Sequence, residues 1–492
     1  MLIFNFKTIT DMKNIKFIVL ALLGLTYSCD VDEFLNPDPE SLVTVSTFFK
    51  TDADVEQGIL GVYDAIQGIP EETTSSVITT NKGVQFEYLL TEHRSDNTRS
   101  ATIEGSKADF HRYIVEPTNN ESMDYYQSMY EVIFRSNNML QYVDVADEDN
   151  QTPYTAELRF LRAYAYFNLV RLYGDVPLVL NVVSPTESSR LYTRVASTEV
   201  YAAIIEDLEY AAANMGAATT KNRASQPAAQ GLLAKAYLSL DTPDYAGAQA
   251  MCEAIINSGV YVLEADYNDV FYDEMGNDEV IFSIGYIPGL DSDSQGFSSE
   301  FDSDAGRQDG LNIPNDNLVN AFTGDAGVVR SAFSYRVSLN DLELYEVGKY
   351  FPDGVTDGDF SAIIPRNAGN DWIVLRYADI LLLHVEAIMA GANTTTDAAA
   401  LASFNAIRAR AVGAANDYAL ITQDDLLLER RLELAFENQR FFDLQRFGVA
   451  AQVLADHAAE EGYTFSTTDL LLPIPQSEIN LSNGLLTQNP GY

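Results

Sequence analysis

The sequence predicts a mainly α-helical protein made of helix pairs, together with an irregular, loop-rich region that contains a few short strands. Three observations support this fold class. Long stretches repeat apolar residues at steps of three and four, which puts those residues on one face of a helix. Neighbouring stretches are joined by short linkers, as expected of paired helices. The segments between the pairs are rich in glycine, serine, aspartate and asparagine, and one of them follows a strand-like run.

The first residues have the pattern of a signal segment rather than of a structural helix. Lys13 and Lys16 precede an apolar run over residues 17–25. This run has roughly the length of a signal-peptide core and is far too short to span a bilayer. Met12 begins the same segment and is an alternative start site. We predict that residues 1–28 are a signal peptide that is removed from the mature chain.

Cys29 directly follows this segment. The small residue Ser28 stands before it, and the junction resembles the lipobox at which bacterial lipoproteins are cleaved and acylated, although Thr26 replaces the usual leucine. We expect Cys29 to carry the lipid; the alternative is a plain signal peptide with an incidental cysteine. The other cysteine, Cys252, lies between apolar helix positions and is expected to be a buried thiol.

The charge of the chain excludes several kinds of partner. It carries 72 acidic and 30 basic residues, a net charge of −42. Loss of residues 1–28 removes three lysines and one aspartate, so the mature chain carries −44. Such a surface repels nucleic acid and anionic lipid headgroups, so attachment to a membrane has to come from the lipid itself. Residues 29–492 are long and apolar enough to form one domain with a large core.

Two long helices are predicted at 121–144 and 156–174, joined by a linker that contains Pro153. Gly174 is expected to end the second helix. A third helix is predicted over 197–215, with its first two residues as possible caps. The second helix presents one apolar stripe, formed by Leu158, Leu161, Ala165, Leu169 and Leu172.

The next pair, at 227–240 and 244–259, resembles a tetratricopeptide unit: helix, short turn, helix. We expect its small residues to allow close approach of the two helices; they are Gly231, Ala234, Ala236, Ala246, Ala250 and Ala254. A similar pair follows at 376–392 and 397–413. Because the spacing between units is irregular, a regular solenoid is not expected.

Between these pairs the sequence predicts a strand and two long loops. Residues 278–286 are apolar and partly β-branched, and they end near a glycine, as a short buried strand does. Loops are predicted over 288–325 and 348–371. Loops of this length in one domain are usually functional, so binding is expected there.

Four blocks resemble, in order, signature regions of the SusD/RagB family of outer-membrane nutrient-binding lipoproteins. They are "ELRFLRAYAYFNLVRLYGDVPLV", "LRYADILLLHVEA", "ERRLELAFENQRFFDLQRFG" and "LLPIPQSEINLSNGLLTQNPGY". The segment "FLNPDPES" after Cys29 also fits the start of that family. The resemblance spans nearly the whole mature chain.

The resemblance implies a fold of about four tetratricopeptide-like helix pairs that support a loop-rich ligand region. It also implies a role without catalysis: a lipid-anchored protein on the outer face of the outer membrane, which captures glycans as the lid of a SusC-like TonB-dependent transporter. Some relatives handle peptides instead. No cofactor is implied. The alternative from another class is an adaptor whose helix pairs hold a peptide or partner protein.

The resemblance also places ligand contacts in the stretch around Arg94, Asp96 and Asn97, although Asp96 and Asn97 could instead cap a turn. Tyr286 matches the place of a stacking aromatic, and Arg366 is a further candidate. The only tryptophan leads into a buried segment, so it is either a sugar platform or a packing residue; it is Trp372.

The sequence contains weak signs of calcium binding and of glycoside hydrolysis. The stretch "DSDSQGFSSEFD" places Asp291, Asp293 and Asp302 at offsets that approximate a calcium loop, but the usual bidentate glutamate is missing. Paired carboxylates suit a glycosidase, yet 72 acidic residues produce such pairs at any spacing. The four histidines have no metal-ligand spacing, and no nucleophile elbow or phosphate loop is present. We therefore expect a binding protein, not an enzyme.

Overall fold

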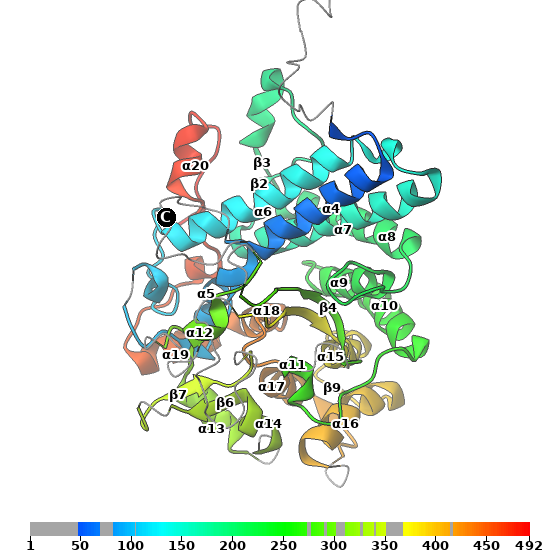
Figure 1. The fold of residues 1–492 in the computed structure, drawn as a ribbon. Helices are drawn as coiled ribbons and strands as arrows, with labels where there is room; N and C mark the ends of the chain where they lie inside the picture. The colour runs from blue at the N-terminus through cyan, green and yellow to red at the C-terminus, as the bar shows by residue number, and fades with distance from the viewer. Residues whose placement is uncertain are drawn as a thin grey trace, which may run out of the picture.

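Long helices that pack side by side form the scaffold of the molecule (Figure 1). Helix α7 packs against α6 and α8, α9 packs against α8 and α10, and α15 packs against α10 and α16. These helices confirm the predicted helical fold class, and the predicted segments fall on them. Their bounds are α6 Asn120–Met139, α7 Glu148–Tyr173, α8 Ser197–Asn214, α9 Gln226–Leu238, α10 Tyr245–Ser258, α15 Tyr377–Met389 and α16 Ala398–Val412.

The computed structural model describes residues 48–68, 82–103, 105–272, 277–289, 293–301, 310–324, 328–338, 341–350, 368–413 and 417–492. Within these ranges no helix is long and apolar enough to cross a membrane. The other α-helices are α4 Asp52–Gln67, α5 Glu87–Leu90, α11 Asp269–Tyr272, α12 Phe297–Phe301, α13 Asp316–Phe322, α14 Val328–Ser334, α17 Gln423–Glu433, α18 Arg440–Arg446, α19 Ala450–Glu461 and α20 Gln476–Leu481.

The strands pair two by two, all antiparallel, in the part of the chain that the structure describes. The central pair joins β4, which the sequence predicted, to β8. Both strands are largely buried, and together they bring the chain back to the scaffold after the excursion between α10 and α15. The strands are β1 Thr98–Arg99, β2 Val176–Pro177, β3 Arg194–Val195, β4 Val280–Ile284, β5 Ile313–Pro314, β6 Tyr335–Val337, β7 Tyr345–Val347, β8 Trp372–Arg376, β9 Thr394–Thr395 and β10 Ile421–Thr422.

The start of α7 and the predicted caps of α8 differ from the prediction. Helix α7 begins at Glu148, so Pro153 lies inside it rather than in a linker. A proline is tolerated there because so little of the helix precedes it that few hydrogen bonds are lost. Neither Ser197 nor its neighbour caps α8; instead the N–H of Ser197 donates to Asp175 Oδ1 at 2.8 Å, and this carboxylate lies beyond the helix start. Gly174 ends α7 with a positive φ of 71°, as predicted.

The small residues of the α9–α10 pair do not all serve close approach. Ala246, Ala250 and Ala254 lie on the exposed face of α10, whereas the buried face carries Cys252 and Ile255. Both faces of α10 are poor in charge, so the apolar pattern could not choose between them. Gly231 does permit close approach, but to β8: a Cβ there would lie 2.2 Å from a side-chain carbon of Leu375.

The segment predicted as one long loop over 288–325 is partly regular. It contains the short elements α12, β5 and α13. Helix α12 is buried along its whole length, and its Glu300 accepts a hydrogen bond from Tyr88 Oη at 2.8 Å. Contacts of this kind come from residues far apart in the sequence, so the local composition did not indicate them.

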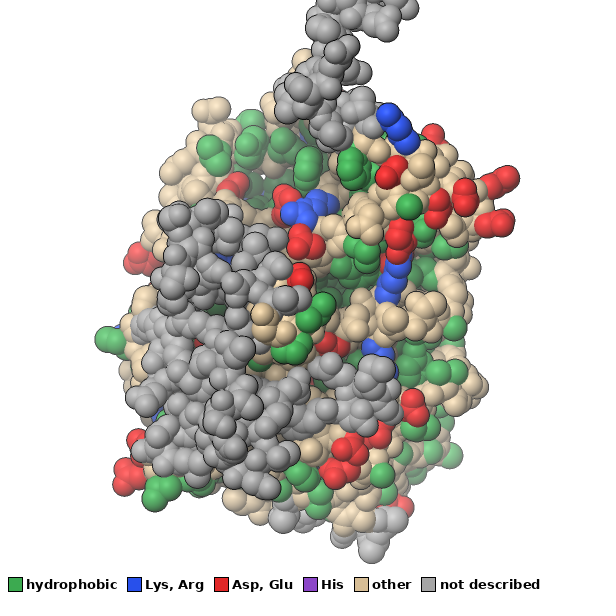
Figure 2. All heavy atoms as spheres, viewed as in Figure 1, with side chains coloured by type: hydrophobic (Ala, Val, Ile, Leu, Met, Phe, Trp, Pro, Cys, Tyr) green, Lys and Arg blue, Asp and Glu red, His purple; other side chains and the backbone are tan. Residues whose placement is uncertain are grey.

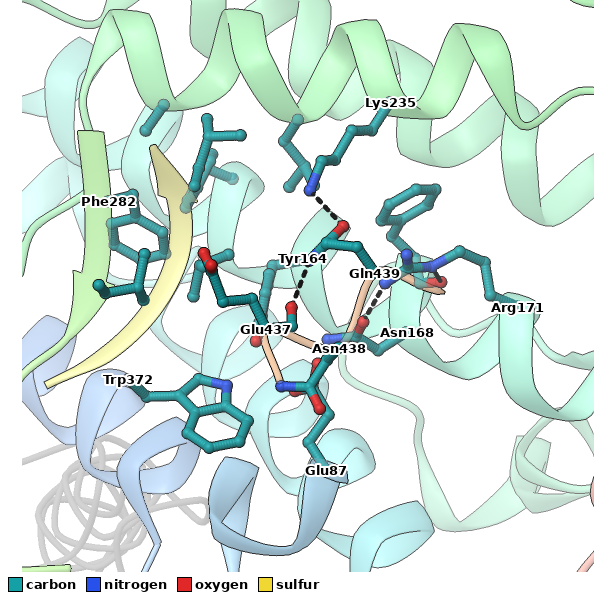
Figure 3. Close-up of a pocket in the computed structure, with 17 residues that line it drawn as sticks. Glu87, Tyr164, Asn168, Arg171, Lys235, Phe282, Trp372, Glu437, Asn438 and Gln439 are labelled. Atoms are coloured by element: carbon teal, nitrogen blue, oxygen red, sulfur yellow. Dashed lines mark hydrogen bonds between the residues drawn. The ribbon is translucent and has the colours of Figure 1, made fainter. Parts of the chain in front are cut away.

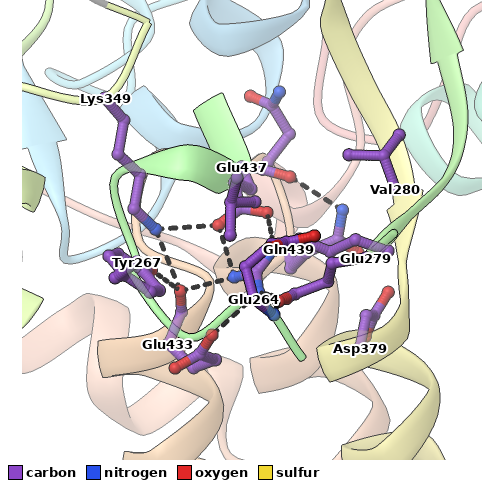
Figure 4. Close-up of polar contacts among 12 residues, drawn as sticks. Glu264, Tyr267, Glu279, Val280, Lys349, Asp379, Glu433, Glu437 and Gln439 are labelled. Atoms are coloured by element: carbon purple, nitrogen blue, oxygen red, sulfur yellow. Dashed lines mark hydrogen bonds and ion pairs between the residues drawn. The ribbon is translucent and has the colours of Figure 1, made fainter. Parts of the chain in front are cut away.

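Buried ion pairs join this excursion to the scaffold (Figure 4). Arg376, at the end of β8, donates to Glu279 at 2.7 Å, to Glu433 at 2.7 Å and to Glu437 at 2.6 Å. Lys349, beyond β7, donates to Glu437 at 2.7 Å. All five side chains are almost completely buried. We call this group the central ion cluster. It connects the residue before β4, the segment after β7 and the end of β8 to α17 and the segment that follows α17.

The cluster is balanced, which explains how it can lie inside the protein. Burial alone would raise the pKa of Glu433, but the charges of Arg410, Arg376 and Arg330 outweigh burial and hold that pKa well below its usual range. Burial lowers the pKa of Lys349 to about 8, while Glu437 acts in the opposite direction. Each charge is thus stabilised by its neighbours and would be costly without them.

Replacement of Arg376 should therefore destabilise the fold strongly. Arg376→Met leaves three buried carboxylates short of their counter-charge, and the loss of one partner from such a cluster costs roughly 3 to 5 kcal/mol. We expect a lower midpoint in urea unfolding followed by circular dichroism. The matched control is Arg135→Met, because Arg135 pairs with Glu131 at 2.7 Å on the surface; its loss should cost about 0 to 1 kcal/mol. Equal effects of the two substitutions would contradict a structural role for the cluster.

Candidate functional site

The residues around Asp96, which the sequence placed in a ligand site, lie in the interior. Asp96 accepts two hydrogen bonds from Arg440, at 2.8 and 3.0 Å, and pairs with Arg431 at 3.1 Å. Burial raises the pKa of Asp96, but the two guanidinium groups outweigh burial and hold it well below its usual range. The neighbouring Asn97 accepts from Arg431 at 2.8 Å and donates to Glu92 at 3.1 Å. These contacts tie the segment to α17 and α18.

Arg94 is buried in the same region. Its guanidinium lies over the ring of Phe441, 4.3 Å from the centroid, and donates to the carbonyl of Asp469 at 2.7 Å. Burial lowers the pKa of this guanidinium to about 10. All of its observed contacts are internal, as are those of Asp96 and Asn97. A role of these three residues in ligand binding stays a prediction, and their burial argues against it.

The two aromatic candidates also pack inside. Tyr286 donates its hydroxyl hydrogen to the carbonyl of Gln67 at 2.9 Å, and its ring packs against Phe297. Trp372 is 1% exposed; its ring lies 4.8 Å from that of Phe297 and 5.7 Å from that of Tyr350. Trp372 therefore fits the packing role better than that of a sugar platform. The two rings share one aromatic cluster with Phe297, which the sequence could not indicate.

The remaining predicted residues are only partly covered. Cys29, Arg366, Asp291 and Asp302 lie outside the described residues. In the proposed calcium loop, Gln295 is buried, and its side chain donates to Ser298 while accepting from the same residue's N–H. Helix α12 then begins at Phe297, inside the stretch that a calcium loop would need. No group of histidine, cysteine or acidic side chains in the described ranges is arranged to hold a metal ion.

A small polar cavity lies at the centre of the molecule, between α7, α9 and the β4–β8 pair (Figure 3). Its lining includes Glu87, Arg171, Lys235, Trp372 and Glu437. Burial raises the pKa of Glu87 to about 7, opposed by the charge of Arg171. The cavity holds only about 30 Å³, which is room for a water molecule or two. It is therefore part of the core and cannot admit a sugar ring.

An open cleft of about 450 Å³ is large enough for a ligand. We call it the polar cleft. Three segments form it: the α8–α9 linker, the segment between α10 and β4, and the residue before β8. Its lining is Ala218, Thr219, Thr220, Lys221, Asn222, Val260, Tyr261, Asn277, Asp278, Val280, Ile281 and Asp371.

The polar cleft combines a buried aromatic floor with exposed polar groups. Tyr261 is 8% exposed and lies beside Val280 and Ile281, whereas Asn222 and Asp278 are exposed at its edge. Carboxylate, amide and hydroxyl groups around an apolar floor are what a sugar needs, because its hydroxyls bond in pairs and its ring faces are apolar.

Asp371 is fixed in place within the cleft. It accepts hydrogen bonds from Asn222 at 2.5 Å, from Ser283 at 2.9 Å and from the N–H of Tyr286 at 3.3 Å. Burial raises its pKa, and the bonds from Asn222 and Ser283 oppose that rise. The same carboxylate thus positions Asn222 at the edge of the cleft and anchors the end of the β4 strand. Sequence analysis missed these residues; the polar linker "ATTKNR" was the one available signal.

A second depression, which we call the apolar groove, has a volume of about 300 Å³ and lies along α6 near α20. Aromatic and aliphatic side chains dominate it, among them Tyr126, Tyr130, Phe134, Leu191 and Tyr192. Large apolar side chains are exposed on the two helices that contribute to its lining, Phe134 of α6 at 57% and Leu481 of α20 at 63%. Exposed apolar groups gathered in one place are typical of surfaces that contact another molecule.

Known proteins share this fold along nearly the whole chain. A solved SusD superfamily protein of Bacteroides vulgatus has a TM-score of 0.75 and 22% identity, covering 91% of this chain and 100% of that one. A solved laminarin-binding SusD-like protein has a TM-score of 0.71 and 25% identity, covering 90% of this chain and 100% of that one.

Sequence comparisons also identify SusD-like proteins as relatives. The SusD-like protein P2 of Formosa agariphila is 27% identical, over 97% of this chain and 99% of its own length. A family model described as "SusD family" matches residues 338–492, and one described as "starch-binding associating with outer membrane" matches residues 33–238. The chain therefore belongs to the SusD family.

Proposed function

We propose that this protein binds an oligosaccharide in the polar cleft and delivers it, as a lid, to a SusC-like TonB-dependent transporter. The observation that carries the proposal is the cleft itself: an aromatic floor beneath carboxylate, amide and hydroxyl groups, in a chain of the SusD family. One relative of similar fold is named for binding laminarin, and another, from Bacteroides fluxus, is named as a surface glycan-binding protein. These names support a glycan as the ligand.

The proposed location is the outer face of the outer membrane, with Cys29 as the lipid anchor. One matching family model carries outer-membrane association in its description. The strongly negative chain offers no electrostatic attraction to anionic headgroups, so lipid has to supply the attachment. Binding without catalysis is proposed because two solved relatives are named for binding, one for laminarin and one for surface glycans.

The adaptor alternative is disfavoured by the scaffold. Tetratricopeptide-type adaptors need open helix faces on which a peptide can lie. In α7 nearly every side chain from Ala156 to Tyr173 is buried, and α15 is buried along most of its length. The helices are thus occupied by packing, and the open polar cleft is formed by the segments between them.

The apolar groove is our proposed contact with the transporter. Helices α6 and α20, which contribute to its lining, lie in the upper part of the view in Figure 1, and α4 begins there too. A lid tethered there would present α6 and α20 toward the membrane side. The exposed Phe134 and Leu481 would be covered by a protein partner in that arrangement.

Substitutions in the polar cleft should weaken glycan binding while the protein stays folded. Asp278→Ala removes an exposed carboxylate that can accept from sugar hydroxyls. Asn222→Ala removes an exposed amide that also donates to Asp371, so we expect a small fall in its melting temperature as well. Loss of such a hydrogen bond costs on the order of 1 to 3 kcal/mol, about a tenfold to hundredfold loss of affinity. The measurement is isothermal titration against a panel of soluble polysaccharides, together with thermal melting.

Asp96→Ala is the control for this test, because it should lower the melting temperature and leave glycan affinity unchanged. It leaves Arg431 and Arg440 buried without their shared carboxylate, so the melting temperature should fall while the folded fraction binds normally. If Asp96→Ala removes binding at an unchanged melting temperature, the ligand site lies around Asp96 and not in the cleft. Absence of heat with every glycan would contradict the proposed function.

Cys29→Ala should abolish membrane attachment and leave a soluble, folded protein. The proposed attachment is the lipid on Cys29, and no helix in the described ranges is long and apolar enough to span a bilayer. The measurement is fractionation of cells that lack the partner transporter, with detection of the protein in each fraction. A variant that remains in the membrane fraction under these conditions would show that Cys29 is not the tether.

Charged substitutions in the apolar groove should separate the lid from its transporter. Phe134→Asp combined with Leu481→Asp places charge on the exposed groove face, so the co-expressed SusC-like transporter should no longer co-purify with the tagged protein. The matched control is Leu428→Asp on α17, since Leu428 is 47% exposed but lies away from the groove. Loss of co-purification with the control as well would speak against the groove as the contact.

A further inference from the structure

Many of the positive charges of this protein lie in its interior. Within the described ranges, twelve lysine and arginine side chains form ion pairs while at most 9% exposed, and the whole chain has 30 such residues. They are Lys107, Arg162, Lys235, Arg330, Lys349, Arg376, Arg408, Arg410, Arg430, Arg431, Arg440 and Arg446. Their partners are carboxylates that are also largely buried, so these pairs nearly cancel. The excess negative charge of the chain therefore lies on its outside.

The visible surface shows this arrangement. In Figure 2, blue Lys and Arg side chains are sparse on the face that is drawn, while red Asp and Glu side chains recur across it. A surface of this kind produces a negative potential that extends about one Debye length, roughly 8 Å at physiological ionic strength. A ligand that carries its own negative charges is repelled before it reaches any pocket.

The polar cleft adds to this field rather than cancelling it. Two carboxylates line the cleft, Asp278 and Asp371, against one cation, Lys221. A third acid lies next to it, because the N–H of Asp278 donates to Glu264 Oε1 at 2.6 Å. Asp278 is exposed at the edge, where a sugar would pass it. Within the cleft, then, local charge and overall charge have the same sign.

We infer that the polar cleft takes an uncharged glycan and rejects polyanionic glycans such as uronate-rich or sulfated polysaccharides. This inference rests on the proposed function, that the cleft binds a glycan, and adds the class of glycan. Carboxylates and an amide bind hydroxyl groups well, because a carboxylate accepts from adjacent hydroxyls and an amide both accepts and donates. Facing a sulfate ester or a uronate, the same carboxylates repel its negative charge.

The test compares a neutral glycan with a charged derivative of the same glycan. A panel of neutral and anionic polysaccharides, with laminarin and polygalacturonate among them, is titrated into the purified mature protein. The glycan that binds is then sulfated, and a second sample is acetylated to the same degree as an uncharged control. In 20 mM NaCl we expect the sulfated form to bind at least tenfold more weakly than the acetylated form. In 500 mM NaCl this difference in affinity should become smaller, because salt screens the charges.

The outcomes separate this inference from the proposed function. Binding of an anionic glycan that tightens as salt is lowered would overturn the inference and leave the proposed function standing. Absence of binding by every glycan of the panel, neutral or anionic, would overturn the proposed function and the inference with it. A sulfated form that binds like the acetylated form at both salt concentrations would also overturn the inference.

Charge reversal locates the effect in the cleft. In 20 mM NaCl, Asp278→Lys should reduce the ratio of the affinities for the acetylated and the sulfated glycan by several-fold. The control is Glu460→Lys, which changes the net charge by the same amount at an exposed position on α19, a helix that does not line the cleft. If the two variants reduce this affinity ratio equally, the discrimination against the sulfated glycan comes from the whole surface and not from the polar cleft.

Discussion

Arg376 is the residue on which the arrangement of this protein most depends. Its guanidinium bonds three carboxylates, and these come from the start of β4, from α17 and from the segment after α17. The chain leaves the helical scaffold after α10 and returns at β8, so two distant stretches have to be held at the same place. Apolar packing alone is not directional, whereas a guanidinium fork fixes the positions of its acceptors. The strand pair that carries the polar cleft is held by this fork.

The same contacts explain why the family is recognisable from sequence. The block "ERRLELAFENQRFFDLQRFG" supplies Glu433 and Glu437 to the central ion cluster, and Arg431 and Arg440 to Asp96. These residues are buried and structural. The signature therefore indicates the fold, and it carries little information about the ligand. The cleft lies in linkers outside that block, where ligand preference can change without disturbing the ion pairs.

The limits of sequence analysis follow from the range of the interactions. Helices such as α7 and α15 were predictable because their periodicity is local. The environment of Asp96 was not, since its partner Arg440 lies 344 positions away in the chain and nothing near Asp96 reveals it. A polar stretch without helical periodicity suits an open loop and a buried salt-bridge cluster equally well. For the same reason the cleft was missed: Asn222, Asp278 and Asp371 come from three separate segments, and each alone is an ordinary turn residue.

Cys252 makes the mature protein convenient for measurements of motion. Its thiol is fully buried in α10, and burial raises its pKa, so it stays protonated and out of reach of reagents. The chain's only other cysteine is Cys29, at the proposed lipid anchor. A cysteine introduced at an exposed position would then be the sole reactive thiol of the protein. A single fluorophore or spin label could be attached there without removal of Cys252, and the angle of the lid over its transporter could be followed directly.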